Sequence, residues 1–413
     1  MKLLANSRRI PEILMIPVLG LALYLRLHFL WNGQLEPLEW DQLNYTKMAL
    51  QWLEIGVYAY RDTVPNTLVT PGFPAFLAMM LRMFGYEQPE ATLMLVREVQ
   101  CFIGLVAIWF IFRTGSRLFT PGAGLLAALF AAVYPSYVWS SSLILTEVIF
   151  LSSFSVLLFL QVRIIQENRR TDHILAGAML ALTVLIRPNV LPLGVVPYLF
   201  LWIKSRRIPW AMILRGAISF SILMLPWWVR NWITFHEFIP IAKGEAGNPF
   251  LGGTDPYFRG TIDWETVGEE GQFREGLRRI REGLIQDPLL WIGWFTVGKF
   301  RVFFRTLWVG AYPFSVPEWY FYLLNKLHFL LVYTGLAVLP VMALRGRMAY
   351  GYLLAGLAVF WGVHQVFIPV DRYLYGMLPF LMLGVAGAAA QLTASVAARG
   401  RLLWPSWRRT AQE

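Results

Sequence analysis

The chain has 413 residues, of which 57% are hydrophobic and 15% charged, and its mean hydropathy is +0.52. These values leave too little polar surface to cover a soluble domain of this length, so they predict a polytopic membrane protein. In such a protein the net charge of +11 marks cytoplasmic loops and gives no support for nucleic-acid binding. The single cysteine, Cys101, excludes an intrachain disulfide framework and a multi-cysteine metal site.

Apolar stretches of about 20 residues predict about ten membrane-spanning helices in one all-α domain covering residues 1–413. The first stretch is expected to remain as a span, because Arg26 and His28 stand where a signal peptide would have its small-residue cleavage site. The spans are expected at 10–30, 99–117, 122–139, 143–162, two short ones within 171–203, then 210–229, 322–344, 349–367 and 373–392.

Lysine and arginine gather on alternate connections, and the positive-inside rule identifies that side as cytoplasmic. Both termini are expected there, since the basic groups include Lys2, Arg8 and Arg9 at one end and Arg399, Arg401, Arg408 and Arg409 at the other. The opposite side would carry two long external loops, about residues 31–89 and 230–288, with interfacial helices. One of these is predicted at 265–284, where apolar and charged residues alternate at helical spacing.

The apolar segment 289–309 contains three cations, Lys299, Arg301 and Arg305. If it crossed the membrane fully, the orientation of the last three spans would be inverted. We therefore expect an interfacial or re-entrant helix whose cations extend toward lipid headgroups.

The first external loop contains a candidate base. Pro37 and Asp41 indicate the start of a helix that has Asp41, Tyr45 and Trp52 on one face. In the first turn the helix dipole favours the ionised carboxylate, which could accept a proton from a hydroxyl nucleophile. The alternative is that Asp41 only caps the helix, with Tyr45 and Trp52 as interfacial anchors. Glu39 and Asp41 form a weak metal-binding pattern, so no metal site is expected.

Other charged residues fall near the outer membrane surface. Glu147 lies inside the expected span 143–162, where an acid indicates either function or pairing with a neighbouring arginine. Arg187 lies at the apex of the 171–203 hairpin, whose legs of roughly 16 residues reach only about 24 Å. It therefore needs an anionic partner, a wet cavity or a lipid phosphate. Arg230 and Arg372 also fall on the external side, and guanidiniums gathered there suggest a bound phosphate.

In order, these pieces resemble the GT-C type polyprenyl-phosphate-sugar-dependent glycosyltransferases, specifically the bacterial protein-mannosyltransferase-like and aminoarabinose-transferase-like family. The resemblance rests on Trp40-Asp41 to Tyr45, Thr70-Pro71-Gly72-Phe73-Pro74, Leu145-Thr146-Glu147, Leu185-Ile186-Arg187-Pro188, Pro226-Trp227 to Arg230-Asn231, and Arg372-Tyr373 with Pro379. It implies a GT-C-like fold in the bacterial plasma membrane and Asp41 as the catalytic base. The family often has two adjacent acids at this point, whereas here Asp41 is followed by Gln42 and the second acid is Glu39.

The implied reaction moves a sugar from a polyprenyl-phosphate-linked donor to a hydroxyl of a lipid, glycan or protein acceptor on the extracytoplasmic face. Arg187, Arg230 and Arg372 would bind the donor phosphate, while Glu39, Tyr45, Glu147 and Tyr373 are further substrate-site candidates. No cofactor is required, and a single displacement would invert the anomeric centre. The rivals are a transporter or lipid flippase, which predicts duplicated halves that the sequence does not show, and a noncatalytic membrane assembly factor.

Overall fold

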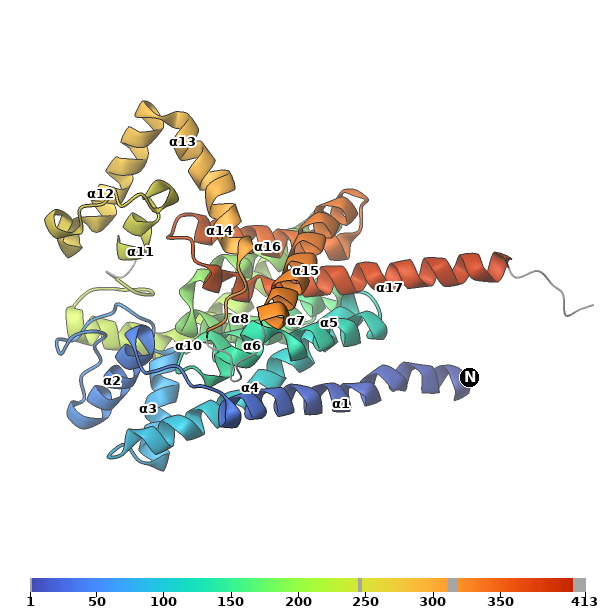
Figure 1. Ribbon diagram of the computed structural model, residues 1–413, viewed down its shortest axis with the longest axis horizontal. Coiled ribbons are helices and arrows are strands. Elements are labelled where there is room, and N and C mark those ends of the chain that lie inside the picture. Colours follow the sequence, from blue (N-terminus) through green and yellow to red (C-terminus); the bar gives the residue numbers. More distant parts are fainter. Residues whose placement is uncertain (1, 244–246, 311–317, 404–413) are drawn as a thin grey trace, which may run out of the picture.

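The computed structural model describes residues 2–243, 247–310 and 318–403, and the regular elements in these ranges are helical (Figure 1). Six helices are long and apolar enough to cross a membrane. They are α1 (Lys2–Asn32), α4 (Pro89–Leu118), α7 (Glu147–Glu167), α10 (Trp210–Phe235), α15 (Glu318–Leu344) and α17 (Leu378–Leu403). The predicted all-α, multi-pass membrane architecture is thereby confirmed.

The predicted number of about ten spans is not confirmed, because the described residues contain six candidates, or seven with one bent pair. That pair joins α5 (Pro121–Val133) to α6 (Pro135–Trp139) and η1 (Ser140–Ser142) at an angle of 61°. The expected 171–203 hairpin forms α8 (Arg170–Ile186), η2 (Pro188–Val195) and α9 (Val196–Ser205). Pro188 and Pro192 break its second leg, which leaves α9 too short to span a bilayer. The span expected at 349–367 forms α16 (Met348–Gln365), which is not among the six.

The two long loops do contain helices, and these lie away from the chain termini. The first loop forms α2 (Trp40–Ile55) and α3 (Gly72–Phe84); the second forms α11 (Gly247–Gly252), η3 (Pro256–Phe258) and α12 (Trp264–Gln286). The latter includes the helix predicted at 265–284. In Figure 1 these elements lie at the left, whereas the first turns of α1 and the last turns of α17 lie at the right. Both described ends therefore lie on the same side of the molecule. That this side faces the cytoplasm stays a prediction. Arg408 and Arg409, on which the prediction also rested, lie outside the described residues.

Small residues allow the central helices to approach closely. At the crossing of α8 and α10, a Cβ added to Gly177 would lie 2.0 Å from the backbone oxygen of Gly216. At the crossing of α4 and α5, one added to Gly124 would lie 2.4 Å from the backbone oxygen of Phe112. Packing of small residues is the main source of helix association in lipid, where the hydrophobic effect between helices is absent. It sets the position of α8, whose last residue precedes Arg187.

Arg26 fixes the bend between α5 and α6 from within the bundle. Its guanidinium donates to the carbonyl oxygens of Ala131 at 3.4 Å and Ala132 at 3.1 Å, at the end of α5 where helical partners are missing. We expect Arg26→Met to destabilise the protein by about 2–3 kcal/mol, because these buried carbonyls lose their donor. Thermal unfolding in detergent measures the effect, with Arg82→Met at an exposed position of α3 as the control. Equal midpoints for the two variants would contradict this role.

The expectation for segment 289–309 is corrected at one residue. The segment forms α13 (Pro288–Gly293), a π-helical turn η4 (Trp294–Gly298) and α14 (Lys299–Arg305), and none of the six candidate spans includes it. Arg301 and Arg305 are exposed, but Lys299 is fully buried and does not extend outward. Its Nζ donates to the backbone oxygens of Gln365 at 2.7 Å and Phe367 at 2.9 Å, because the carbonyls at the end of α16 lack helical partners and carry partial negative charge.

Candidate functional site

Four charged side chains from distant parts of the chain meet in one group, here called the Asp41–Glu147 cluster: Asp41, Glu147, Arg187 and Arg372. Arg372, in η5 (Asp371–Gly376), donates from Nη1 to Asp41 Oδ2 at 3.0 Å. Arg372 Nε and Arg187 Nη2 both donate to Glu147 Oε1. The cluster therefore joins the first loop, α7, the end of α8 and the segment before α17. All four residues were site candidates from the sequence, but the sequence did not predict which of them bind one another.

Glu147 is the buried centre of the cluster. The expected span 143–162 begins four residues late, so Glu147 is the first residue of α7 and does not lie one turn inside it. Its side chain is fully buried, while those of Arg187 and Arg372 are 14% and 22% exposed. The free N–H groups and the dipole at a helix N-terminus favour a carboxylate there. Pairing with arginine, the alternative left open for Glu147, is thus what the structure shows, with two arginines on one oxygen.

Of the three alternatives open for Arg187 at the hairpin apex, the structure shows an anionic partner, Glu147. Besides its bond to Glu147, it donates from Nε to Thr146 Oγ1 at 2.8 Å. Burial alone would lower the pKa of Arg372, but Glu147 and Asp41 raise that pKa above its ordinary value. Two hydrogen bonds to side chains fix the orientation of each guanidinium. Thr146 was part of a sequence motif, but nothing in the sequence indicated that it would bind Arg187.

Asp41 has the most exposed side chain of the four residues in the cluster. Helix α2 begins at Trp40, and Glu39 holds the N-cap position without a side-chain capping bond, so the interpretation of Asp41 as an N-cap is wrong. Asp41 lies in the first turn with its side chain 35% exposed. Tyr60 donates its hydroxyl to Asp41 Oδ1 at 2.7 Å, and Arg61 Nη2 lies 3.8 Å from the same oxygen.

Tyr60 is a site residue that sequence reasoning missed. It follows Asp41 by 19 positions in a loop without helical periodicity, so spacing offered no signal. Burial and the neighbouring Asp41 carboxylate raise the pKa of Tyr60, which keeps its hydroxyl protonated as a donor. Tyr60 therefore orients one oxygen of Asp41 while Arg372 holds the other.

The remaining candidates lie around the cluster. The ring of Tyr45 packs 5.4 Å from Tyr60 and 5.2 Å from Phe73, between centroids, and that of Tyr373 lies 4.6 Å from His364. Glu39 is exposed and takes no part in the hydrogen bonds of the cluster described above. Among the described residues, no group of three or more histidine, cysteine or acidic side chains could hold a metal ion.

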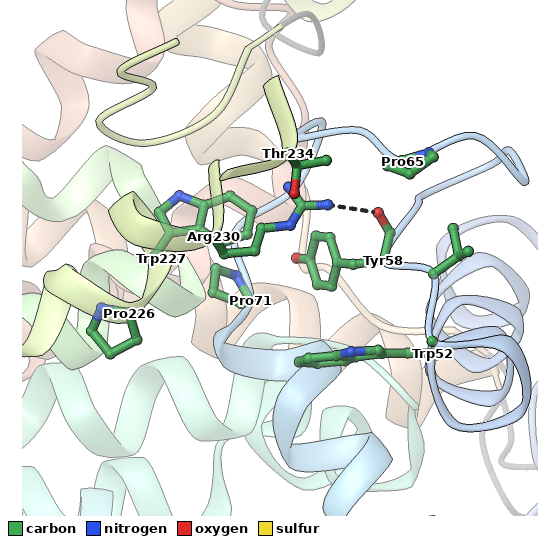
Figure 2. Close-up of a pocket in the computed structure, with 10 residues that line it drawn as sticks. Trp52, Tyr58, Pro65, Pro71, Pro226, Trp227, Arg230 and Thr234 are labelled. Carbon is green, nitrogen blue, oxygen red and sulfur yellow. Dashed lines mark hydrogen bonds between the residues drawn. The ribbon is translucent and has the colours of Figure 1, made fainter. Parts of the chain in front are cut away.

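Arg230 does not join Arg187 and Arg372, although the sequence grouped the three. It lies on α10 and donates to the backbone oxygens of Tyr58 at 3.0 Å and Asn66 at 3.1 Å, and to Asn231 Oδ1 at 2.9 Å. Figure 2 shows it in a separate pocket with Tyr58 and Trp227. The loop between α2 and α3 binds the guanidinium by its backbone, which no sequence pattern could indicate.

Gln42, the residue after Asp41, has a bridging role in the structure. Its buried amide accepts from the backbone N–H of Ile144 at 2.9 Å and donates to the backbone oxygen of Pro37 at 3.2 Å. Ile144 lies three residues before Glu147, so the amide connects the segments that carry the two carboxylates of the cluster. Only a group that both accepts and donates can make these two bonds.

We therefore expect Gln42→Glu to lower the free energy of unfolding by about 1–3 kcal/mol, because an ionised carboxylate has no hydrogen to donate to Pro37 and would be buried. Thermal unfolding of the purified protein tests this, with Gln88→Glu at the exposed start of α4 as the matched change. A Gln42→Glu protein as stable as Gln88→Glu would contradict the bridging role.

Comparison with known families supports the resemblance read from the motifs. Residues 68–229 match the family model described as dolichyl-phosphate-mannose-protein mannosyltransferase. The predicted resemblance to GT-C type, protein-mannosyltransferase-like enzymes is thereby confirmed. The matched segment includes Glu147 and Arg187, whereas Asp41 and Arg372 lie outside it. A search of curated proteins found no significant match.

Solved structures show the fold. The apo oligosaccharyltransferase of Archaeoglobus fulgidus is similar with a TM-score of 0.57 and 14% identity, over 96% of this chain and 52% of that one. The oligosaccharyltransferase AglB of the same organism, in complex with an inhibitory peptide and a dolichol-phosphate, is similar with a TM-score of 0.50 and 14% identity. The similarity covers 96% of this chain and 52% of that one. ArnT from Cupriavidus metallidurans, bound to undecaprenyl phosphate, has a TM-score of 0.44 and 12% identity, over 94% of this chain and 79% of that one. This TM-score is too low to support the fold assignment. The chain spans about half the length of the oligosaccharyltransferase structures.

Proposed function

We propose that this protein, with its match to the mannosyltransferase family model and its GT-C-like helical fold, is a membrane glycosyltransferase. It would move a sugar from a polyprenyl-phosphate-linked donor to an acceptor hydroxyl at the extracytoplasmic face. The observation that carries the proposal is the Asp41–Glu147 cluster, in which the partly exposed carboxylate of Asp41 is held beside the oriented guanidiniums of Arg187 and Arg372. A solved oligosaccharyltransferase of similar fold was obtained with dolichol-phosphate, which supports a lipid-phosphate ligand for this architecture.

Asp41 would act as the general base. The acceptor hydroxyl loses its proton to Asp41 as its oxygen attacks the anomeric carbon, and the bond from that carbon to the phosphate oxygen breaks. The electron pair of the broken bond leaves with the polyprenyl phosphate. Tyr60 and Arg372 each hold one oxygen of Asp41, so the carboxylate needs little reorganisation before it takes the proton.

Arg187 and Arg372 would stabilise the charge that develops on the departing phosphate. Each guanidinium has five N–H donors, and the bonds to Glu147, Thr146 and Asp41 use only two on each arginine. The others are available for phosphate oxygens, to which arginine binds in bidentate fashion. Glu147 is fully buried behind them and keeps both cations oriented before donor arrives.

The guanidiniums supply the positive charge at the phosphate, so the proposal requires no cofactor, and a divalent metal remains optional. Tyr45 and Tyr373 would line the sugar site next to the cluster, and Glu39 would contribute only at its rim. Because the acceptor attacks directly, the glycosidic bond formed should have the opposite anomeric configuration to the donor. Proton-coupling constants in the nuclear magnetic resonance spectrum of the product measure this, and retention would contradict direct attack.

The function is tested by transfer in reconstituted membranes. Purified protein is incubated with radiolabelled polyprenyl-phosphate mannose, chosen because the matching family is described by mannose, and then with other hexose and pentose donors. Acceptors are offered as lipid, glycan and peptide hydroxyls. The expected result is label on one acceptor class together with an equal amount of free polyprenyl phosphate. Movement of intact donor lipid across the bilayer without release of phosphate would support a flippase instead.

A further inference from the structure

His364 is a buried histidine near the end of α16 that lies outside the Asp41–Glu147 cluster. Its side chain is 1% exposed and packs among aromatic rings. The ring centroids of Phe360 and Tyr373 each lie 4.6 Å from that of His364, and the centroid of Phe303 lies 6.5 Å away. Phenylalanine would fill such a place without burying polar atoms, so a histidine here directs attention to its two ring nitrogens.

Both ring nitrogens of His364 make hydrogen bonds. Nδ1 lies 2.7 Å from the backbone oxygen of Phe360, which can only accept, so Nδ1 carries the hydrogen. Nε2 lies 2.7 Å from Nδ2 of Asn189, which donates to it. The first bond therefore fixes a neutral ring with Nε2 as the acceptor, and this acceptor binds a residue of a different segment.

The two segments that meet at His364 are the segments that carry the arginines of the cluster. Asn189, in η2, lies two residues after Arg187, and Tyr373, in η5, lies one residue after Arg372. Asn189 binds the edge of the histidine ring, and the ring of Tyr373 packs against it. The same two segments are therefore joined at two points, by the shared acid of the cluster and by this histidine.

The backbone around His364 is itself held in place. Lys299 donates to the backbone oxygens of Gln365 and Phe367, and the backbone N–H of Phe367 donates to the oxygen of His364 at 3.1 Å. The next residue, Ile368, donates from its backbone N–H to the oxygen of Pro249 at 2.7 Å. His364 is therefore a firm support for the segments that bind it.

Such a support matters for the way in which Arg187 and Arg372 would meet a phosphate. Both guanidiniums bind the same oxygen of Glu147, and each could pivot about that bond. The positions of the two backbones decide where the remaining N–H donors point. A displacement of about 1 Å in groups that bind a reacting centre can lower a rate by about 100-fold.

We propose that His364 and Asn189 are positioning residues for sugar transfer. Their hydrogen bond sets the spacing at which Arg187 and Arg372 meet the departing phosphate. The two residues act through the arginines and do not touch the substrate. This inference rests on the proposed function, in which that phosphate is the leaving group.

The test breaks the hydrogen bond from each side and then restores it. His364→Phe keeps a ring and removes the acceptor, and Asn189→Leu keeps a similar shape and removes the donor. His364→Gln again offers an oxygen to Asn189. The matched control is His328→Phe on α15, since His328 is also buried and its Nδ1 lies 2.6 Å from the hydroxyl of Tyr134.

Transfer per folded molecule, binding of polyprenyl phosphate and the unfolding midpoint are measured on the purified full chain. We expect kcat to fall by about 10-fold to 100-fold in His364→Phe and in Asn189→Leu, with the donor KM nearly unchanged. The double variant should be no slower than the slower single variant, because both changes remove the same bond. His364→Gln should recover most of the rate. His328→Phe should unfold at a lower temperature and still transfer at the wild-type rate.

Polyprenyl phosphate is the leaving group with its charge fully developed, so it should bind about 10-fold more weakly to both single variants. The proposal is overturned if both single variants transfer at the wild-type rate per folded molecule, or if the loss in the double variant is the product of the two single losses. Failure of the proposed function differs, because wild type itself would then transfer no sugar. Binding of polyprenyl phosphate decides the inference in that case, and absent binding, or equal binding by wild type and His364→Phe, overturns it.

Discussion

Replacing Asp41 with asparagine should lower the rate of sugar transfer by about 100-fold to 10,000-fold, the usual contribution of a general base. Asparagine retains the shape but has one acceptor oxygen, which can still accept from Arg372, while its amide N–H can donate to the Tyr60 hydroxyl. The first turn of α2 should therefore remain in place. What it cannot do is take the proton of the acceptor hydroxyl. The measurement is initial transfer rate at saturating donor, with the unfolding midpoint recorded on the same preparation.

The matched control for this change is Asp62→Asn in the same loop. Asp62 is exposed, and its Oδ1 accepts from the backbone N–H groups of Thr63 at 2.6 Å and Val64 at 3.2 Å. An asparagine oxygen can keep both bonds, so transfer should continue at the wild-type rate. If Asp41→Asn and Asp62→Asn behaved alike, the acid of the first loop would have no part in the chemistry.

Glu147→Gln should have the largest effect on stability, about 3–5 kcal/mol, because it removes the charge shared by Arg187 and Arg372. The two guanidiniums would then repel each other with less compensation in a mostly buried place. Folded protein should decrease, and the fraction that folds should transfer slowly, because the arginines lose their fixed orientation. Fluorescence-detected size exclusion and thermal unfolding give the first effect, and transfer per folded molecule gives the second.

Glu90→Gln provides the comparison, since Glu90 also lies in the first turn of a membrane helix, α4, but is exposed. Glu90→Gln should lower the free energy of unfolding by at most a few tenths of a kcal/mol, which is the usual effect of a surface charge at a helix end. A Glu147→Gln protein as stable as Glu90→Gln would show that the buried carboxylate is not what holds the two arginines together.

The sequence predicted the parts of the site that depend on local signals. Pro37 and the spacing of Asp41, Tyr45 and Trp52 located the start of α2, and hydropathy located the six candidate membrane spans. The reach of the hairpin around Arg187 indicated that this residue needed an anionic partner, a wet cavity or a lipid phosphate, and the structure shows the first of these. Such inferences succeed because helical period, length and charge near lipid are properties of short segments.

The parts that could not be predicted depend on contacts between distant segments. Tyr60 reaches Asp41 from an irregular loop, and Lys299 is buried because carbonyls 66 and 68 positions away accept from it. Arg230 carries the same charge as Arg187 and lies near the same predicted surface, yet a loop backbone separates it from the cluster. The count of about ten spans is not confirmed, and one reason is that prolines break the second leg of the hairpin, which hydropathy alone does not register.

The most direct test compares donor binding and transfer in the same sample. Wild type and Asp41→Asn are loaded with labelled polyprenyl-phosphate sugar, the bound donor is counted, and acceptor is added for a single turnover. The proposed mechanism predicts equal loading of the two proteins, with rapid transfer by wild type and almost none by Asp41→Asn over the same interval. Transfer of the bound sugar by Asp41→Asn at the wild-type rate would contradict the assignment of Asp41 as the base.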